Sequence, residues 1–287
     1  MKRFPAFACI TLTLGFVPPP ASADNLVGDY TPYPAGTHLA GMRYGYSWGG
    51  DLRARGESLD ADFEYRDQQG LLSVSRYAGR STRWAAFAAL PFGRTEADSE
   101  RLRLHSDDSG IGDPYMIVAL WPLVRETYHL AFSGWLHVPL GSYEPGRVVN
   151  QGMNVWSAKA EANLTWRPRP AWTLELTTAT RFFADNDEYG PSHATLERDP
   201  RYTVETRVVR DVRPGLRLSL DYFYHAGSET AVNGVERDDA WNDHAAQLTL
   251  FRRLGERRAL TIWYRNDFVV RSGPEYQTVA VRFMQAF

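Results

Sequence analysis

Apolar and polar residues alternate with a period of two along most of the chain. The clearest stretch runs from Asn154 to Pro168, NVWSAKAEANLTWRP. From Trp156 onward three alanines, Leu164 and Trp166 share one parity, and polar residues occupy the other. Successive side chains of a β-strand point to opposite faces, so this pattern predicts a strand with one apolar and one polar face.

Twelve segments of this kind, bounded by turn residues, can be marked along the chain. They lie at 37–48, 57–79, 82–93, 112–123, 126–139, 152–167, 171–184, 200–210, 214–226, 241–253, 258–270 and 275–287. Read as two strands, the segment 57–79 would raise the number to thirteen. Its apolar parity shifts between Tyr65 and Leu72, which predicts a bulge or a break near Gln68 to Gly70.

The links between these segments favour twelve strands. Short links alternate with longer ones, and 271–274 is the one short link where a long one is expected. The short links are 80–81, 124–125, 168–170, 211–213 and 254–257, and the long links are 49–56, 94–111, 140–151, 185–199 and 227–240. This layout is typical of a bacterial outer-membrane barrel. The sequence therefore predicts an all-β fold, a transmembrane antiparallel up-and-down β-barrel of twelve strands over 37–287.

Strand length and composition agree with a membrane setting. Aromatic residues make up 13% of the chain, although the mean hydropathy is −0.40, and a barrel needs an apolar residue only at every second position. The ten steps from Trp156 to Trp166 rise by about 25 Å along the membrane normal at ~3.3 Å per residue and a tilt of about 40°. We expect the strand-end tryptophans to lie at the lipid interfaces: Trp84, Trp156, Trp166 and Trp172.

The first 23 residues have the pattern of a secretory signal peptide. Two basic residues precede a mostly apolar run and the small residues Ala-Ser-Ala at 21–23, which predicts cleavage before Asp24 and export to the outer membrane of a Gram-negative cell. The one cysteine, Cys9, leaves with this peptide, so the exported chain forms no disulfide. Residues 24–36 are expected to form a short periplasmic segment, and the pattern leaves open whether it folds into the lumen.

The charge balance provides no global basic field of the kind that binds nucleic acid. Without Lys2 and Arg3 the 32 basic residues fall to 30 against 34 acidic ones, a net charge of −4. The long links are rich in acid and the short turns in arginine. Acidic links could meet the divalent cations that bridge lipopolysaccharide, but ordinary solvated charge is the favoured interpretation. The chain ends on Phe287, a signal typical of substrates of the barrel-assembly machinery.

The polar parity of the strands defines candidate lumen residues. If the apolar faces meet the lipid bilayer, charged side chains of both signs project inward, where they would pair across a narrow interior and form a constriction. These candidates are Arg43, His129, His137, Lys159, Glu161, Glu175, Arg181, Glu205, Arg207, Arg217, Asp221, Arg265, Asp267 and Arg282.

No pattern points to a catalytic, cofactor or metal site. Ser133 and His129 share the inward parity, which is a weak hint of a barrel phospholipase, but that parity directs both away from lipid, so we expect no enzyme. The acidic run from Asp185 to Glu188 lacks the spacing of a calcium loop. The histidines outside the strand that holds His129 and His137 are scattered without metal-ligand spacing, and no phosphate-binding or dinucleotide motif occurs.

Several short motifs in order resemble one family of outer-membrane proteins. They are YPAGT at 33–37, AALPFG at 88–93, GIGDPY at 110–115, VPLGSYEP at 138–145 and NQGMNVW at 150–156, together with the aromatic C-terminus. The chain resembles the family named after the MetA pathway of phenol degradation. The resemblance covers nearly all of the exported chain and implies a barrel that passes small, often aromatic or hydrophobic compounds; it brings no catalytic residues.

Three hypotheses follow. The first is a monomeric channel for passive passage of a small solute. The second is a non-conducting barrel that serves a structural or surface-interaction role through its acidic outer links. The third, which is the weakest, is the barrel phospholipase.

Overall fold

A computed structural model describes residues 25–79 and 83–287. The expected signal peptide, residues 1–23, lies outside the described residues. Within the described ranges there is no helix long and apolar enough to cross a membrane.

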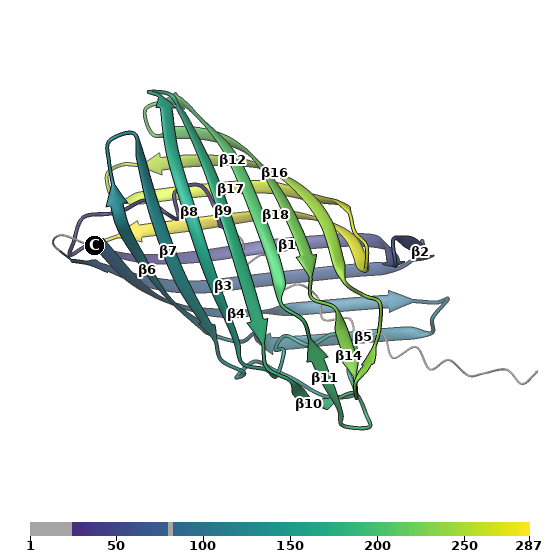
Figure 1. Cartoon of the computed structure of the whole chain (residues 1–287). Coiled ribbons are helices and arrows are strands. Elements are labelled where there is room, and N and C mark those ends of the chain that lie inside the picture. The colour runs from purple at the N-terminus through teal and green to yellow at the C-terminus, as the bar shows by residue number, and fades with distance from the viewer. Residues whose placement is uncertain (1–24, 80–82) are drawn as a thin grey trace, which may run out of the picture.

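Twelve antiparallel strands form a closed barrel, which confirms the predicted fold class and strand number (Figure 1). The barrel closes between its first and last strands, with Leu39 opposite Ala286 and Arg53 opposite Gly273. The strands are β1 (His38–Ala54), β3 (Glu64–Ala78), β4 (Arg83–Ser99), β6 (Tyr115–Val124), β7 (Tyr128–His137), β8 (Ser157–Arg169), β9 (Trp172–Phe183), β12 (Arg201–Arg213), β13 (Leu216–Gly227), β16 (Trp241–Leu254), β17 (Arg258–Val269) and β18 (Gly273–Ala286).

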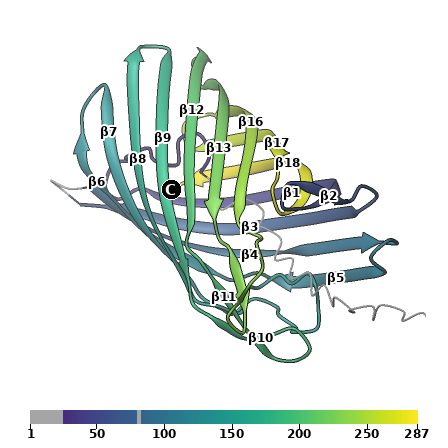
Figure 2. The ribbon, with the colours of Figure 1, turned by 45° about the vertical axis from the view of Figure 1, so that its right-hand side comes forward.

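The long links fold into further strands at one end of the barrel, which we call the outer end. β2 (Glu57–Asp60) pairs with β1, and β5 (Leu104–Ile111) pairs with β4. A separate four-stranded sheet forms from β10 (Asn186–Tyr189), β11 (Ala194–Arg198), β14 (Thr230–Val232) and β15 (Val235–Glu236). Figure 2 shows β10 and β11 at the same end as β5 and away from the C-terminus. The C-terminus lies at the opposite end, which carries the short links and which we call the turn end.

The structure corrects the prediction for the segment 57–79. β3 begins only at Glu64, and its register with β1 and β4 runs through Gln68 to Gly70 without a shift, so there is no bulge. The apolar parity shifts for another reason. Phe63 and Tyr65 face inward and pack in a buried cluster at the outer end, whereas Leu72 and other residues of the opposite parity are exposed on the outer face.

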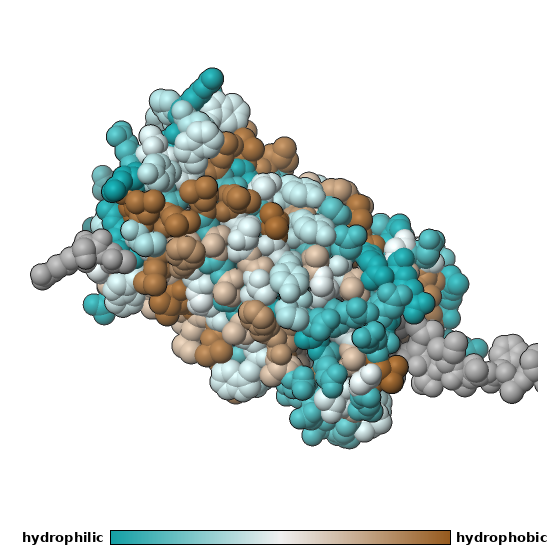
Figure 3. Space-filling view, in the orientation of Figure 1, coloured by the Kyte–Doolittle hydropathy of each residue, from teal (hydrophilic) through white to brown (hydrophobic). Residues whose placement is uncertain are grey.

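The outer face of the barrel is apolar and the interior is polar. Figure 3 shows hydrophobic side chains over the body of the barrel and hydrophilic ones gathered over the outer end. Trp84, Trp156, Trp166 and Trp172 are all exposed on the outer face. Trp156 immediately precedes β8, and Trp166 lies near the other end of this strand. An apolar surface of this extent suits lipid rather than water. That the four tryptophans mark the lipid interfaces stays a prediction.

Candidate pore and N-terminal plug

The segment before β1 folds into the barrel interior. We call residues 25–33 the plug. Asn25, Leu26, Val27 and Tyr30 are buried. Two turns compact the segment: the Asp29 amide donates to the Leu26 carbonyl at 3.1 Å, and the Thr31 amide to the Gly28 carbonyl at 3.0 Å. Asp29 Oδ2 also accepts from the Leu26 amide at 2.8 Å. The segment expected to be periplasmic therefore fills part of the lumen.

Apolar contacts attach the plug to two sides of the barrel. Leu26 packs with Trp263 and Ala280 in one buried cluster. Tyr30 packs in a second cluster that includes Trp121, whose indole Nε1 donates to the Tyr30 carbonyl at 2.9 Å. Burial of these side chains removes apolar surface from water, which favours the inserted position.

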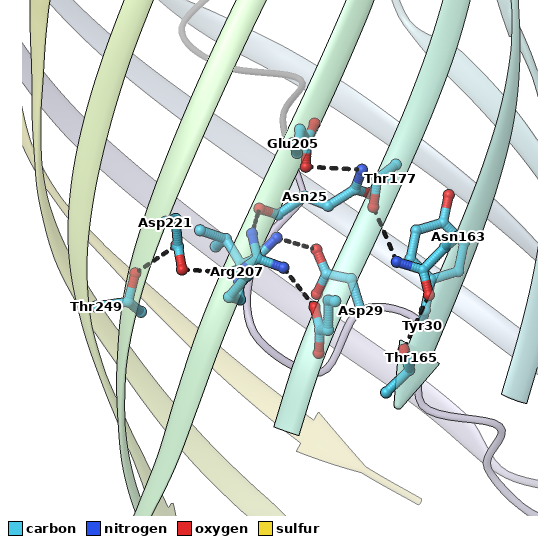
Figure 4. A network of polar contacts seen from close by, with 12 residues as sticks. Asn25, Asp29, Tyr30, Asn163, Thr165, Thr177, Glu205, Arg207, Asp221 and Thr249 are labelled. Carbon is cyan, nitrogen blue, oxygen red and sulfur yellow. Dashed lines mark hydrogen bonds and ion pairs between the residues drawn. The ribbon is translucent and has the colours of Figure 1, made fainter. Parts of the chain in front are cut away.

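Arg207 is the centre of a charged network between the plug and the wall. Its guanidinium pairs with Glu175 at 2.6 Å and with Asp221 at 2.9 Å, and donates to the Asn25 carbonyl. The Asn25 amide in turn donates to Glu205 at 3.5 Å. Figure 4 shows Asn25 lying between Glu205 and Arg207, with Asp221 on the far side of Arg207. One cation is thereby shared by two wall carboxylates and the plug backbone.

A second polar network joins the plug to β7 and β8. The Tyr30 hydroxyl bonds to Ser133 Oγ at 2.9 Å and donates to Glu161. Glu161 pairs with Lys159 at 2.9 Å, and the Lys159 ammonium lies 3.5 Å from the centre of the Trp135 ring. Lys159 on the wall thus neutralises the carboxylate of Glu161, which also accepts a hydrogen bond from the Tyr30 hydroxyl of the plug.

Two arginines hold the plug on the side of the turn end. Arg282 pairs with Asp29 at 2.6 Å, and Arg83 donates to the Pro32 carbonyl at 3.0 Å. These contacts come from β18 and β4, while the two networks above come from β7, β8, β9, β12 and β13. The contacts of the plug with the wall described here are hydrogen bonds, ion pairs and apolar packing.

The structure places the predicted lumen residues at different depths of burial. His137, Lys159, Glu161, Arg181, Glu205, Arg207, Asp221, Arg265 and Asp267 are buried, and Glu175 is nearly so. Arg43, His129, Arg217 and Arg282 are partly exposed and line the interior cavity described below. Among them Arg265 pairs with Asp267 at 2.9 Å, and Arg217 pairs with Asp211 at 2.8 Å. A role of these residues in selecting a solute stays a prediction.

Sequence reasoning did not identify the plug residues as part of the site. Asn25, Asp29 and Tyr30 lie in a stretch without a period of two, so the pattern that assigned inward faces could not place them. The turn-forming pair Gly28 and Asp29 beside the buried Val27 is a signal of a compact segment, but not of its location.

A cavity of about 900 Å³ lies between the plug and the turn end. The plug forms part of its wall, and residues of the short turns line its other end. Nine arginines and five carboxylates line it, so its charge is positive. The arginines are Arg43, Arg125, Arg167, Arg213, Arg217, Arg253, Arg257, Arg258 and Arg282, and the acids are Asp29, Glu126, Glu175, Asp211 and Glu256.

The interior does not assemble the serine and histidine considered for a phospholipase. Ser133 Oγ bonds to the Tyr30 hydroxyl and accepts from Trp135 Nε1 at 2.9 Å, and no hydrogen bond joins it to His129 in the described part of the chain. No group of three or more His, Cys, Asp or Glu residues that could hold a metal occurs within 25–79 and 83–287. The arrangement is that of a polar, partly filled conduit.

A closed barrel with an apolar outer face and a polar interior defines the class of outer-membrane β-barrels. The chain belongs to the family described as "Putative MetA-pathway of phenol degradation", whose model matches residues 53–283. This match confirms the resemblance seen in the sequence motifs. A search of the curated proteins finds no match to the chain.

Solved outer-membrane barrels share the fold. An outer membrane channel from Pseudomonas putida F1 aligns with a TM-score of 0.88 and 24% identity, over 92% of this chain and 100% of that one. The β domain of the Bordetella autotransporter BrkA has a TM-score of 0.53 at 10% identity, over 88% and 100% of the two chains. The NanC porin has a TM-score of 0.51 at 9% identity, over 85% and 98%. The family and the barrel class of this chain locate it in the outer membrane.

Proposed function

We propose that the protein is a channel for the passive passage of small aromatic or hydrophobic compounds across the outer membrane. The observation that carries the proposal is the cavity of about 900 Å³ inside the barrel, bounded on one side by the plug. A cavity of this size is large enough for a drug-sized molecule, since small-molecule pockets span roughly 300–1,000 Å³. The family and the fold support this proposal.

Passage requires the plug to move, because it occupies the lumen beside the cavity. The contacts that hold it are a few charged and polar bonds, through Asn25, Asp29 and Tyr30, together with the packing of Leu26. We therefore propose that the inserted plug is the low-conductance state and that its displacement opens the channel.

Planar-bilayer recording of the refolded exported chain tests this function. We expect the protein to conduct, and a variant without residues 25–33 to conduct more at the same voltage. Liposome swelling with neutral aromatic solutes is the matching flux measurement. Absence of both current and swelling, in the deletion variant as well as in the intact protein, would contradict any channel.

A non-conducting surface-interaction barrel is the second candidate, and the folded outer-end sheet of β10, β11, β14 and β15 favours it. Deletion of 95–111 and 185–199 separates the two candidates. Loss of surface binding with unchanged flux supports the second candidate, whereas altered flux supports the channel.

We also propose that Phe287 is the contact for the barrel-assembly machinery. The ring is 68% exposed, while the Phe287 amide donates to the His38 carbonyl at 2.9 Å. The backbone therefore closes the barrel and the ring is left for a partner.

A further inference from the structure

A second cavity, of about 270 Å³, lies beneath the folded links of the outer end. It is bounded by the link that contains Tyr143 and Met153, by β10 and β11, and by Phe183 at the outer end of β9. Its volume exceeds the roughly 150 Å³ of an engineered cavity that takes up benzene. The cavity is therefore large enough for a molecule with one aromatic ring.

The lining of this outer cavity is cationic although the surrounding links are acidic. Arg103, Arg147 and Arg198 line it, and no carboxylate does among the described residues. Arg147 is already neutralised by Asp108 at 2.5 Å and Glu144 at 2.8 Å. Arg103 is exposed, so Arg198 is the lining cation that is both partly buried and directed at an aromatic ring.

Arg198 has no carboxylate partner within 25–79 and 83–287. Its guanidinium carbon lies 5.4 Å from the centre of the Phe183 ring. Asp239 is near enough to act on its charge, but both oxygens of Asp239 accept hydrogen bonds from Thr230, at 2.7 and 2.6 Å. Burial, with repulsion from Arg201, lowers the pKa of Arg198 to about 10. A partly buried cation with free donors is costly unless an anion binds it.

A row of like charges lies across three neighbouring strands next to this cavity. Lys159 lies opposite Arg181 on β8 and β9, and Arg181 lies opposite Arg201 on β9 and β12. Like charges directly opposite one another destabilise a sheet. Arg181 is buried, and its partners are Ser157 Oγ at 2.7 Å and Met153 Sδ at 3.7 Å, without an ion pair in the described part of the chain.

Met153 connects the two features, because it lines the outer cavity and contacts Arg181. Arg181 and Arg198 both lie against Phe183, with the Arg181 guanidinium carbon 5.1 Å from the ring centre. Of the three cations that lie side by side on β8, β9 and β12, Lys159 is paired with Glu161, and Arg181 is the one that contacts two residues of the cavity lining. An anion that leaves the cavity inward meets positive charge at the next step.

We propose that the outer cavity binds a small organic anion with a single aromatic ring, and that Arg198 pairs with the carboxylate of this anion. The ring occupies the apolar part of the cavity, and Arg181, which has no ion pair in the described part of the chain, is the next cation that the anion meets on its way inward. This inference rests on the proposed channel function and adds to it the charge of the solute.

Binding of benzoate and of benzamide, its neutral analogue, to the refolded exported chain tests the site. Saturation-transfer NMR titration is suited to weak binding. We expect benzoate to bind about tenfold more tightly than benzamide, the effect of one charge-assisted bond, and Arg198→Gln to remove this preference. Arg55→Gln is the matched control, because Arg55 is an exposed outer-end arginine that does not line the cavity. Heat-modifiable mobility on gels verifies that each variant is folded.

Equal affinity of the intact protein for the two ligands would overturn the proposal, as would an unchanged preference in Arg198→Gln. If that variant does not fold, Arg198→Met takes its place, and a benzoate preference equal to that of the intact protein counts against the pairing. Bilayer current distinguishes failure of the anion site from failure of the proposed channel function. Current without a preference for benzoate supports the channel and contradicts the anion site. A preference for benzoate that depends on Arg198, without any current, supports the anion site and contradicts the channel.

Discussion

Replacement of Arg207 by glutamine is expected to destabilise the folded barrel by about 3–5 kcal/mol, the range found when one partner of a buried ion pair is removed. Arg207 is 3% exposed, and its carboxylate partners Glu175 and Asp221 are 9% and 1% exposed. Glutamine leaves both acids buried without their cation. The matched control is Arg217→Gln, whose ion pair with Asp211 is 36% and 31% exposed and contributes roughly 0–1 kcal/mol.

Equilibrium urea unfolding in lipid vesicles, followed by tryptophan fluorescence, measures both variants. If Arg207→Gln lowers the free energy of unfolding no more than Arg217→Gln does, the buried ion pairs of Arg207 do not make the expected contribution. A second check uses Asp221→Asn. Because Arg207 and Asp221 are in contact, the double variant should lose less than the sum of the two single losses. Loss of the Arg207 contact to the plug should also raise single-channel conductance.

Three further predictions concern the outer end and the C-terminus. Asp113→Asn should increase proteolysis of the link 138–156, which limited proteolysis measures. The two oxygens of Asp113 accept hydrogen bonds from two backbone amides of that link, whereas an asparagine side chain has one acceptor oxygen. Phe287→Ala should reduce the amount of folded protein in cells several-fold but leave the refolded barrel's stability unchanged, which separates assembly from folding. The hydrogen bond to Asp98 raises the pKa of His105 above its usual value. The stability that this contact contributes is therefore present below about pH 6.5 and is lost as the pH rises through the raised pKa. An NMR titration in which Asp98→Asn leaves the pKa of His105 unchanged would contradict this prediction.

The barrel itself was predictable because one physical constraint acts on every strand. Leu164 must face lipid and Asn163, its neighbour on the same strand, must not, so the period of two appears in the sequence wherever a strand crosses the membrane. The rule fails beyond the membrane. Phe63 and Tyr65 are buried under outer links rather than exposed to lipid. Because their apolar side chains face inward, the parity of their segment shifts, and this shift led to the wrong prediction of a bulge.

The plug and the outer cavity could not be predicted by the same means. Both depend on contacts between residues far apart in the sequence, and neither contains a strand pattern of its own. The inward parity of Lys159 and Arg181 was readable, but their placement opposite one another depends on strand register. Register is fixed by the pairing of whole strands.

The plug also constrains the order in which the protein folds. Its contacts join residues separated by 131 positions for Tyr30 and Glu161, 180 for Asn25 and Glu205, and 253 for Asp29 and Arg282. Contacts of such long range form late, because a large loop must close before they do. The pairing of β1 with β18 closes the barrel over a similar separation. The plug is therefore made before the strands that it contacts, yet it is among the last segments to reach its final contacts. The lumen around it is completed only when the last strand arrives.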